Sequence, residues 1–148
     1  MIQGETTITI DDKGRMAVPT AYRDTLAGLC GGRLVFAYNP FDAFCLWLFP
    51  APEWERVRDL VGPLSSFNPA HRELKRKLVG SACPVEPDGQ HRLLVPPSMR
   101  TAAGIEKRAV LLGLGDKFEL WSEEAHLKRI ATTISAEDIT AEMQSLRF

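Results

Sequence analysis

The sequence has no excess of positive charge. Its 148 residues carry a formal net charge of −1. Proteins that bind nucleic acid through their overall charge are strongly basic, so this balance counts mildly against such a partner. Any surface for a polyanion must therefore come from charges gathered locally on the fold, or from several copies of the chain acting together.

Cysteine is scarce, and no metal-binding pattern is present. The three cysteines are odd in number and widely spaced, which favours buried free thiols in a reducing compartment over disulfides. None of the three histidines stands at zinc-ligand spacing from a cysteine. We therefore expect no metal and no cofactor. The residues concerned are Cys30, Cys45, Cys83, His71, His91 and His126.

Long apolar runs and a basic-then-apolar leader are also missing from the sequence. We therefore expect neither secretion nor a membrane span, and we place the protein in the cytoplasm. Hydrophobic residues make up 45% of the chain and charged residues 25%. This composition is typical of a globular protein with one core or two small, interlocked cores.

The sequence does contain a motif that occurs twice. Residues 11–19 read Asp-Asp-Lys-Gly-Arg-Met-Ala-Val-Pro, and residues 88–96 read Asp-Gly-Gln-His-Arg-Leu-Leu-Val-Pro. Both copies fit Asp-x-x-x-Arg-apolar-x-Val-Pro, at one offset of 77 residues (88 − 11 and 92 − 15). The constant offset indicates that one half of the chain repeats the other.

Each copy predicts a strand, a tight turn and a second strand, which together form a β-hairpin. Asp favours such a turn because its side chain can accept hydrogen bonds from backbone amides two residues on, and Gly because it tolerates positive φ. The turn would carry basic side chains at its tip. One alternative is that Asp and Arg merely pair across the turn and stabilise it, which would be an adequate explanation for a single copy.

The same reasoning predicts two ββαββ units in an α+β protein, with additional helices. In the first unit we expect strands at 5–11, 15–18, 34–38 and 44–49, and a helix through 19–26 that is ended by Gly28, Gly31 and Gly32. In the second we expect a hairpin around Asp88, a helix from Pro97 to Gly104, and strands at 109–114 and 117–121. Further helices are expected after Pro52, from Asn68 as N-cap to Gly80, over 123–130, and from Ser135 as N-cap through Ile139, Met143 and Leu146.

The helix that begins at Asn68 carries a run of basic residues. We favour a solvated face on a connecting helix over an accessory surface that contacts phosphates. The apolar stripes on the two central helices are candidate interfaces, although core packing is the preferred interpretation of each. The basic residues are Arg72, Lys75, Arg76 and Lys77, and the stripes contain Trp54 and Val57, and Leu74 and Leu78.

Taken together, these features resemble the MraZ family across essentially the whole chain. The resemblance is carried by the doubled motif, the Lys13-Gly14-Arg15 tip, the Pro-x-Pro-Glu-Trp stretch at 50–54, the helix start at Asn68, and the strand at 117–121. MraZ proteins are bacterial transcriptional regulators of the division and cell-wall gene cluster, and they are related to the swapped-hairpin DNA binders AbrB and MazE.

The resemblance implies a pseudo-symmetric double-split β-barrel with peripheral helices, in one interlocked unit. Its first half is expected at 1–62, a connecting helix at 63–79, and its second half with the C-terminal helices at 80–148. The Asp-x-x-x-Arg loops would face double-stranded DNA. The residues carried over are Lys13, Arg15 and Arg92 for DNA binding, and Asp11, Gly14, Asp88 and Gly89 for the structure of the loops.

Within this scheme, Arg15 is the first candidate for a base contact, because a guanidinium matches the paired acceptors of guanine. Lys13 suits a phosphate, and Arg92 suits either. His91 departs from the family pattern, in which Gly precedes the Arg. If that position needs positive φ, a residue other than Gly is strained there or the turn differs.

The family also assembles into rings, which would compensate for the weak charge of one copy. Copies that present the same loops in register would bind tandem direct repeats upstream of the protein's own operon, and affinity would rise through effective concentration. We therefore expect double-stranded DNA and further copies of the chain as partners, in the nucleoid. We expect no membrane and no small-molecule substrate.

Two other classes of function, an enzyme and a protein-interaction module, are alternatives to DNA binding. An enzyme would need Asp11 and Asp88 close enough to share a proton, but each Asp leads into a basic turn with no apolar pocket to raise its pKa. A protein-interaction module similar to an antitoxin would need an exposed tail. The predicted C-terminal helix with Ile139, Met143 and Leu146 is the only candidate for it.

Overall fold

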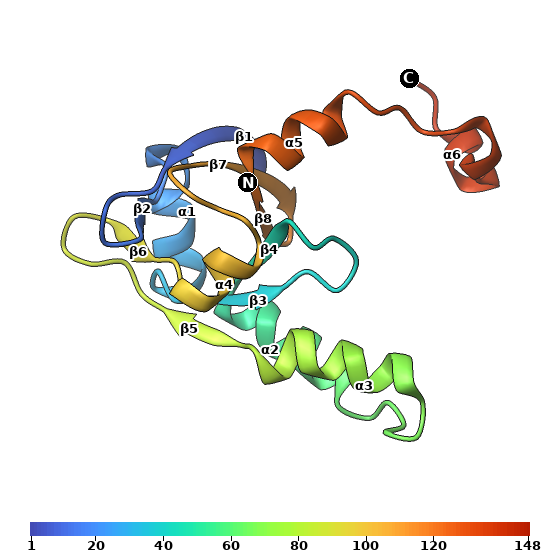
Figure 1. Cartoon of the computed structure of the whole chain (residues 1–148), viewed down its shortest axis with the longest axis horizontal. Helices are drawn as coiled ribbons and strands as arrows, with labels where there is room; N and C mark the ends of the chain where they lie inside the picture. Colours follow the sequence, from blue (N-terminus) through green and yellow to red (C-terminus); the bar gives the residue numbers. More distant parts are fainter.

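In the computed structural model, which describes residues 1–148, the two halves of the chain repeat one order of elements (Figure 1). The first half contains β1 (Ile2–Thr9), β2 (Arg15–Ala17), α1 (Thr20–Cys30), β3 (Leu34–Tyr38), β4 (Cys45–Pro50) and α2 (Ala51–Val61). The second contains β5 (Cys83–Val85), β6 (Arg92–Leu94), α4 (Pro97–Ala102), β7 (Arg108–Gly115), β8 (Phe118–Ser122) and α5 (Glu123–Ile130). The remaining elements are α3 (Pro69–Lys75), a π-helical turn η1 (Arg76–Gly80), a 3₁₀ turn η2 (Ala136–Asp138) and α6 (Ala141–Ser145).

The strands form an antiparallel six-stranded sheet in the order β1-β7-β8-β4-β3-β5, and a separate two-stranded ribbon of β2 and β6. Only β3–β4 and β7–β8 pair within one half, since β1 pairs with β7, β5 with β3, β4 with β8, and β2 with β6. The prediction that the two strands of each motif pair with each other in a hairpin is therefore wrong. A chain reversal follows each first strand, but the two strands that it joins take partners in the other half.

The fold is therefore α+β, as predicted, with the two halves interlocked. The expected double-split barrel stays a prediction, because the strand pairing leaves β1 and β5 as edges and no closed barrel is found. None of the helices combines the length and the hydropathy needed to cross a bilayer.

The main core draws its side chains from both halves, which explains the interlocking. Its 21 buried residues include Met16 and Val18 after the first motif and Leu93 and Val95 after the second, each at most 4% exposed. A smaller cluster lies where α2 and η1 pack on the sheet, and it contains Trp54 and residues of β3 and β4. It also takes in Val57, Leu74 and Leu78, so the two helical stripes are used for packing within the chain.

The predicted helix start at Asn68 is confirmed, and the end of α1 differs from prediction. The Asn68 side chain accepts hydrogen bonds from the backbone N–H groups of Ala70 and His71 at 2.9 and 3.3 Å, as an N-cap does. Helix α1 continues through Gly28 to Cys30, because Gly31 supplies the left-handed C-cap at φ 63°.

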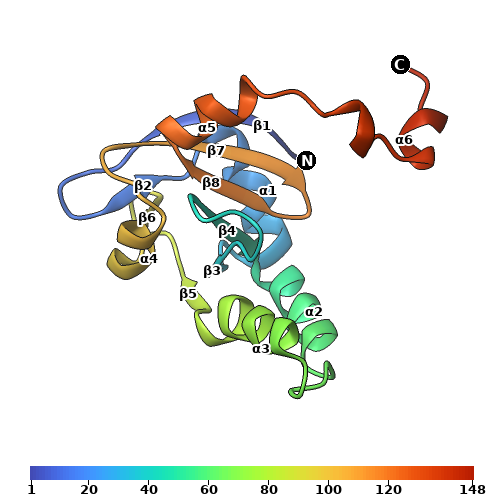
Figure 2. The same cartoon turned by 45° about the vertical axis from the view of Figure 1, so that its right-hand side comes forward.

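The last predicted helix is broken in two. Ser135 precedes only the short turn η2, and α6 begins after Thr140, whose side chain caps it. Beyond α5 the chain runs away from the body of the molecule (Figures 1 and 2). This C-terminal arm, residues 131–148, keeps large apolar side chains in solvent, namely Ile134, Ile139, Leu146 and Phe148.

Candidate nucleic-acid interface

The first motif folds into a loop, residues 11–15, that Asp11 holds together. Its Oδ1 accepts hydrogen bonds from the backbone N–H groups of Lys13 and Arg15, both at 2.9 Å. Its Oδ2 accepts from Arg15 Nε at 2.8 Å. The backbone closes the loop with Gly14 N–H donating to the Asp11 carbonyl, and Asp11 N–H to that of Arg15. We call this segment loop 1.

The second motif, loop 2 (residues 88–92), has the same bonds. Asp88 Oδ1 accepts from the backbone N–H groups of Gln90 and Arg92 at 2.9 and 3.0 Å, and its Oδ2 from Arg92 Nε at 2.9 Å. Gly89 contributes no special backbone conformation, and a Cβ there would meet open space. The Asp, and not Gly89, therefore gives this loop its shape.

Each Asp orients its Arg through a single side-chain hydrogen bond and leaves the terminal amino groups of the guanidinium without a partner. The carboxylate uses Nε alone, and the terminal amino groups of Arg15 and Arg92 have no partner in the chain. The two side chains are 28% and 29% exposed. Because exposed ion pairs contribute only about 0–1 kcal/mol, stabilising the turn is a minor benefit of this pairing. The pairing leaves the outer edge of each guanidinium free for a ligand.

The pKa values of Asp11 and Asp88 are both lowered, whereas a catalytic dyad of carboxylates needs one raised pKa. Hydrogen bonds from the backbone N–H of Arg15 lower the pKa of Asp11 below its ordinary 3.8, and those from Arg92 and Gln90 do the same for Asp88. A shared proton would require one raised pKa. Because the pKa is lowered on folding, each ionised carboxylate contributes its full stabilisation of the fold at a pH above its pKa in the unfolded chain. That stabilisation is lost as the pH falls through the pKa in the folded protein. Both carboxylates are therefore ionised at neutral pH.

The strands that follow the loops pair with each other in the β2–β6 ribbon. Arg15 lies opposite Leu94, Met16 opposite Leu93, and Ala17 opposite Arg92. Met16 and Leu93 are each 1% exposed and face the core. Because side chains alternate along a strand, the other two pairs face outward. Both arginines therefore project from one face of a single ribbon.

Antiparallel pairing places the two loops at opposite ends of the ribbon. Arg15 is the diagonal neighbour of Arg92, a relation that separates residues by roughly 7–8 Å. Each loop is also tied to the opposite strand end, since Val95 N–H donates to the Gly14 carbonyl at 2.9 Å and Val18 N–H to the His91 carbonyl at 2.8 Å. Ribbon and loops thus form one continuous, hydrogen-bonded surface.

The residue before each Arg has positive φ, 82° at Gly14 and 59° at His91. The second loop therefore keeps the geometry of the first despite its departure from the repeat, and it does so with a strained residue. An L-residue in this left-handed region costs about 1–2 kcal/mol, although His tolerates it better than most.

We expect Gly14→Ala to destabilise the fold by about 1–2 kcal/mol, because alanine is strained at this φ and its Cβ would lie 3.1 Å from Arg100 Nη2. His91→Ala is the matched control and should change stability by less than about 0.5 kcal/mol, because a Cβ is already present there. Urea unfolding measures both. Equal effects at the two positions would contradict this account.

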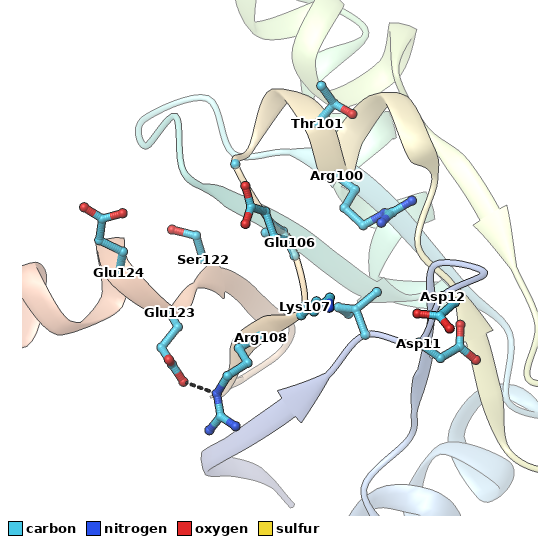
Figure 3. A pocket seen from close by; sticks show the side chains of 13 residues that line it. Asp11, Asp12, Arg100, Thr101, Glu106, Lys107, Arg108, Ser122, Glu123 and Glu124 are labelled. Atoms are coloured by element: carbon cyan, nitrogen blue, oxygen red, sulfur yellow. Dashed lines mark hydrogen bonds and ion pairs between the residues drawn. The ribbon is translucent and has the colours of Figure 1, made fainter.

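A polar cleft of about 860 Å³ lies beside loop 1 (Figure 3). Most of its lining residues are polar, and five acidic and three basic residues come from loop 1, from α4 and the segment after it, and from the start of α5. Figure 3 shows Arg100, on α4, extending toward loop 1. The sequence analysis does not identify this residue as a site candidate. Arg100 stands at the repeat offset from Arg23 (100 − 23 = 77), but Arg23 is not a site candidate either.

The basic run on α3 and η1 makes mainly local contacts. Arg72 Nη1 donates to the Ser66 carbonyl at 2.9 Å, Lys75 Nζ to the Leu64 carbonyl at 2.6 Å, and Arg76 pairs with Glu73. Figures 1 and 2 both place α3 on the opposite side of the molecule from the loops. The interpretation as a solvated connecting helix is therefore favoured.

Comparison with known proteins gives one consistent family. The model of the family described as "MraZ protein, putative antitoxin-like" matches residues 1–77 and again residues 78–147. A relative from Xanthomonas campestris pv. campestris (strain 8004) is 58% identical over 147 residues, covering 99% of both chains. One from Stenotrophomonas maltophilia (strain R551-3) is 60% identical over 139 residues, covering 94% of both. Both are named "Transcriptional regulator MraZ". The chain belongs to the MraZ family.

Proposed function

We propose that the protein is a sequence-specific DNA-binding transcriptional regulator, and not an enzyme, that reads DNA with the β2–β6 ribbon and its two loops. The observation that carries the proposal is the placement of Arg15 and Arg92 on one outward face, each held by an Asp that leaves its amino groups free. The relatives named as transcriptional regulators support the same role.

The major groove of B-DNA admits a two-stranded β-ribbon, and β2 and β6 form such a ribbon. Arg15 would contact the O6 and N7 acceptors of guanine, and Arg92 a second base or a phosphate. Lys13 is exposed at the tip of loop 1 and would hold a phosphate. Asp11 and Asp88 repel phosphate, so their role would be to orient the arginines.

We further propose that copies assemble into a ring and bind tandem direct repeats upstream of their own operon, in the division and cell-wall gene cluster. A chain of net charge −1 gains little from overall attraction to DNA, so several loops must act together. The protein would act in the cytoplasm, at the nucleoid. Each copy would supply a double-split barrel built from halves 1–62 and 80–148, joined by 63–79.

The test is a salt titration of binding to the DNA upstream of the protein's own gene, with shuffled DNA of equal length as the control. We expect the affinity for the natural sequence to fall steeply and log-linearly with salt, and to exceed that for shuffled DNA by roughly 10³-fold or more at physiological salt. Equal affinity for the two DNAs would sink the proposal.

A second candidate function is that of a protein-interaction module, and the exposed C-terminal arm favours it. Ile134 and Ile139 are 67% and 44% exposed there, and nothing in the chain covers them. A full-length protein that fails to bind DNA but retains a copurifying protein, which is lost on deletion of residues 131–148, would favour this function. If that deletion only lowers the oligomeric state, the arm joins copies of the chain.

A further inference from the structure

Arg100 is a partly buried cation without an acceptor. Its Nε is buried and makes no hydrogen bond, and no carboxylate lies within ion-pair distance of the side chain. Every other arginine except Arg147, next to the C-terminus, donates to a carbonyl or pairs with an acid. Leaving such a group unpaired is costly, so an unpaired guanidinium held in place points to a ligand.

The guanidinium is held against the tip of loop 1. Its Nη2, Cζ and Nε lie 3.1, 3.3 and 3.4 Å from the position that a Cβ on Gly14 would take. Gly14 is buried, whereas the equivalent residue of loop 2, His91, is exposed. Arg100 thus adds a third cation, delivered by the second half of the chain, to the Lys13 and Arg15 of loop 1.

The equivalent arginine of the first half differs from Arg100 in its hydrogen bonding. Arg23, on α1, donates its Nε to the Val18 carbonyl at 3.0 Å and is satisfied within its own half. Arg100 makes no such bond to Val95, the residue equivalent to Val18. Asp11 on loop 1 is already bonded to Arg15, and Asp12 is exposed. Three further carboxylates line the cleft and make no ion pair with Arg100, namely Glu106, Glu123 and Glu124.

We propose that Arg100 is a phosphate-binding residue that holds the DNA backbone beside the base pair contacted by Arg15. The inference rests on the proposed DNA binding. Arg100 lines the cleft flanking loop 1 (Figure 3) and does not lie on the outward face of the ribbon, which suits a phosphate better than a base edge. Its free terminal amino groups match the forked geometry that phosphate oxygens accept.

The test compares Arg100→Gln with Arg23→Gln, its matched control, in salt titrations on the natural sequence and on shuffled DNA. For each engaged copy, Arg100→Gln should lower the slope of log K against log salt by about 0.9, and it should weaken binding to both DNAs by a similar factor. Arg23→Gln should leave the slope unchanged. Arg100→Lys should restore most of the slope, because it keeps the charge.

Thermal unfolding and the oligomeric state show whether each variant is folded. An unchanged slope for folded Arg100→Gln, or a loss of sequence preference at an unchanged slope, would overturn the inference while leaving the proposed function in place. If the wild type itself shows no salt-dependent DNA binding, the proposed function and this inference fall together.

Discussion

Replacing Arg15 with alanine should abolish sequence preference while the protein stays folded. A bidentate contact between Arg and guanine contributes roughly 1–3 kcal/mol of discrimination, or about 5- to 150-fold, at each copy that touches DNA. The loss multiplies over all the copies that bind together. The preference for natural over shuffled DNA should therefore approach one, as measured by competition binding at physiological salt.

Two further variants separate the charge of Arg15 from its geometry and provide a control. Arg15→Lys keeps the charge but not the planar fork, so it should retain the salt slope and still lose preference. Arg58→Ala removes an arginine that is 50% exposed on α2, away from the ribbon, and should bind as the wild type does. If Arg15→Ala keeps its preference, loop 1 is a structural turn, and the basic run on α3 becomes the leading candidate for the DNA surface.

Reducing the target to a single repeat should weaken binding by about 10²- to 10⁴-fold relative to the full array, without any change in the protein. The reason is that the second and later contacts of an assembled oligomer are intramolecular. Titration of DNAs with one, two, three and four repeats measures the effect, and the affinity should rise with each added repeat until the loops in reach are filled.

Spacing provides the control for the repeat experiment. Inserting half a helical turn between repeats keeps every base but rotates alternate sites to the far side of the duplex, and this should reduce affinity nearly to that of one repeat. Inserting a whole turn should be less harmful. If a single repeat binds as tightly as the array, the avidity argument fails.

The loops could be predicted from the sequence because their shape depends on neighbouring residues. Asp11 lies within reach of the N–H groups of residues 13 and 15, so the motif itself specifies the turn and the orientation of Arg15. The Asn68 cap is local in the same way. The repeat offset further indicated that a second loop of the same kind exists around Asp88.

Which strands pair with each other could not be predicted from the sequence. The residues around β1 and β2 have the pattern of a hairpin, but pattern and turn chemistry fix only which face is apolar and not which strand lies alongside. In the β2–β6 pairing, Met16 lies opposite Leu93 and both side chains are buried in the shared core. Arg100 was overlooked for the same reason, because its neighbour Gly14 is far away in the sequence.

The pairing of β2 with β6 also has a consequence for the synthesis of the protein. The β2–β6 ribbon joins residues 15–17 to 92–94, so it cannot form on the ribosome until the second motif has emerged. Pairings of such long sequence separation form late and slowly. A nascent or truncated first half displays loop 1 without its partner strand, so the proposed DNA-binding surface would be complete only after both motifs have been synthesised.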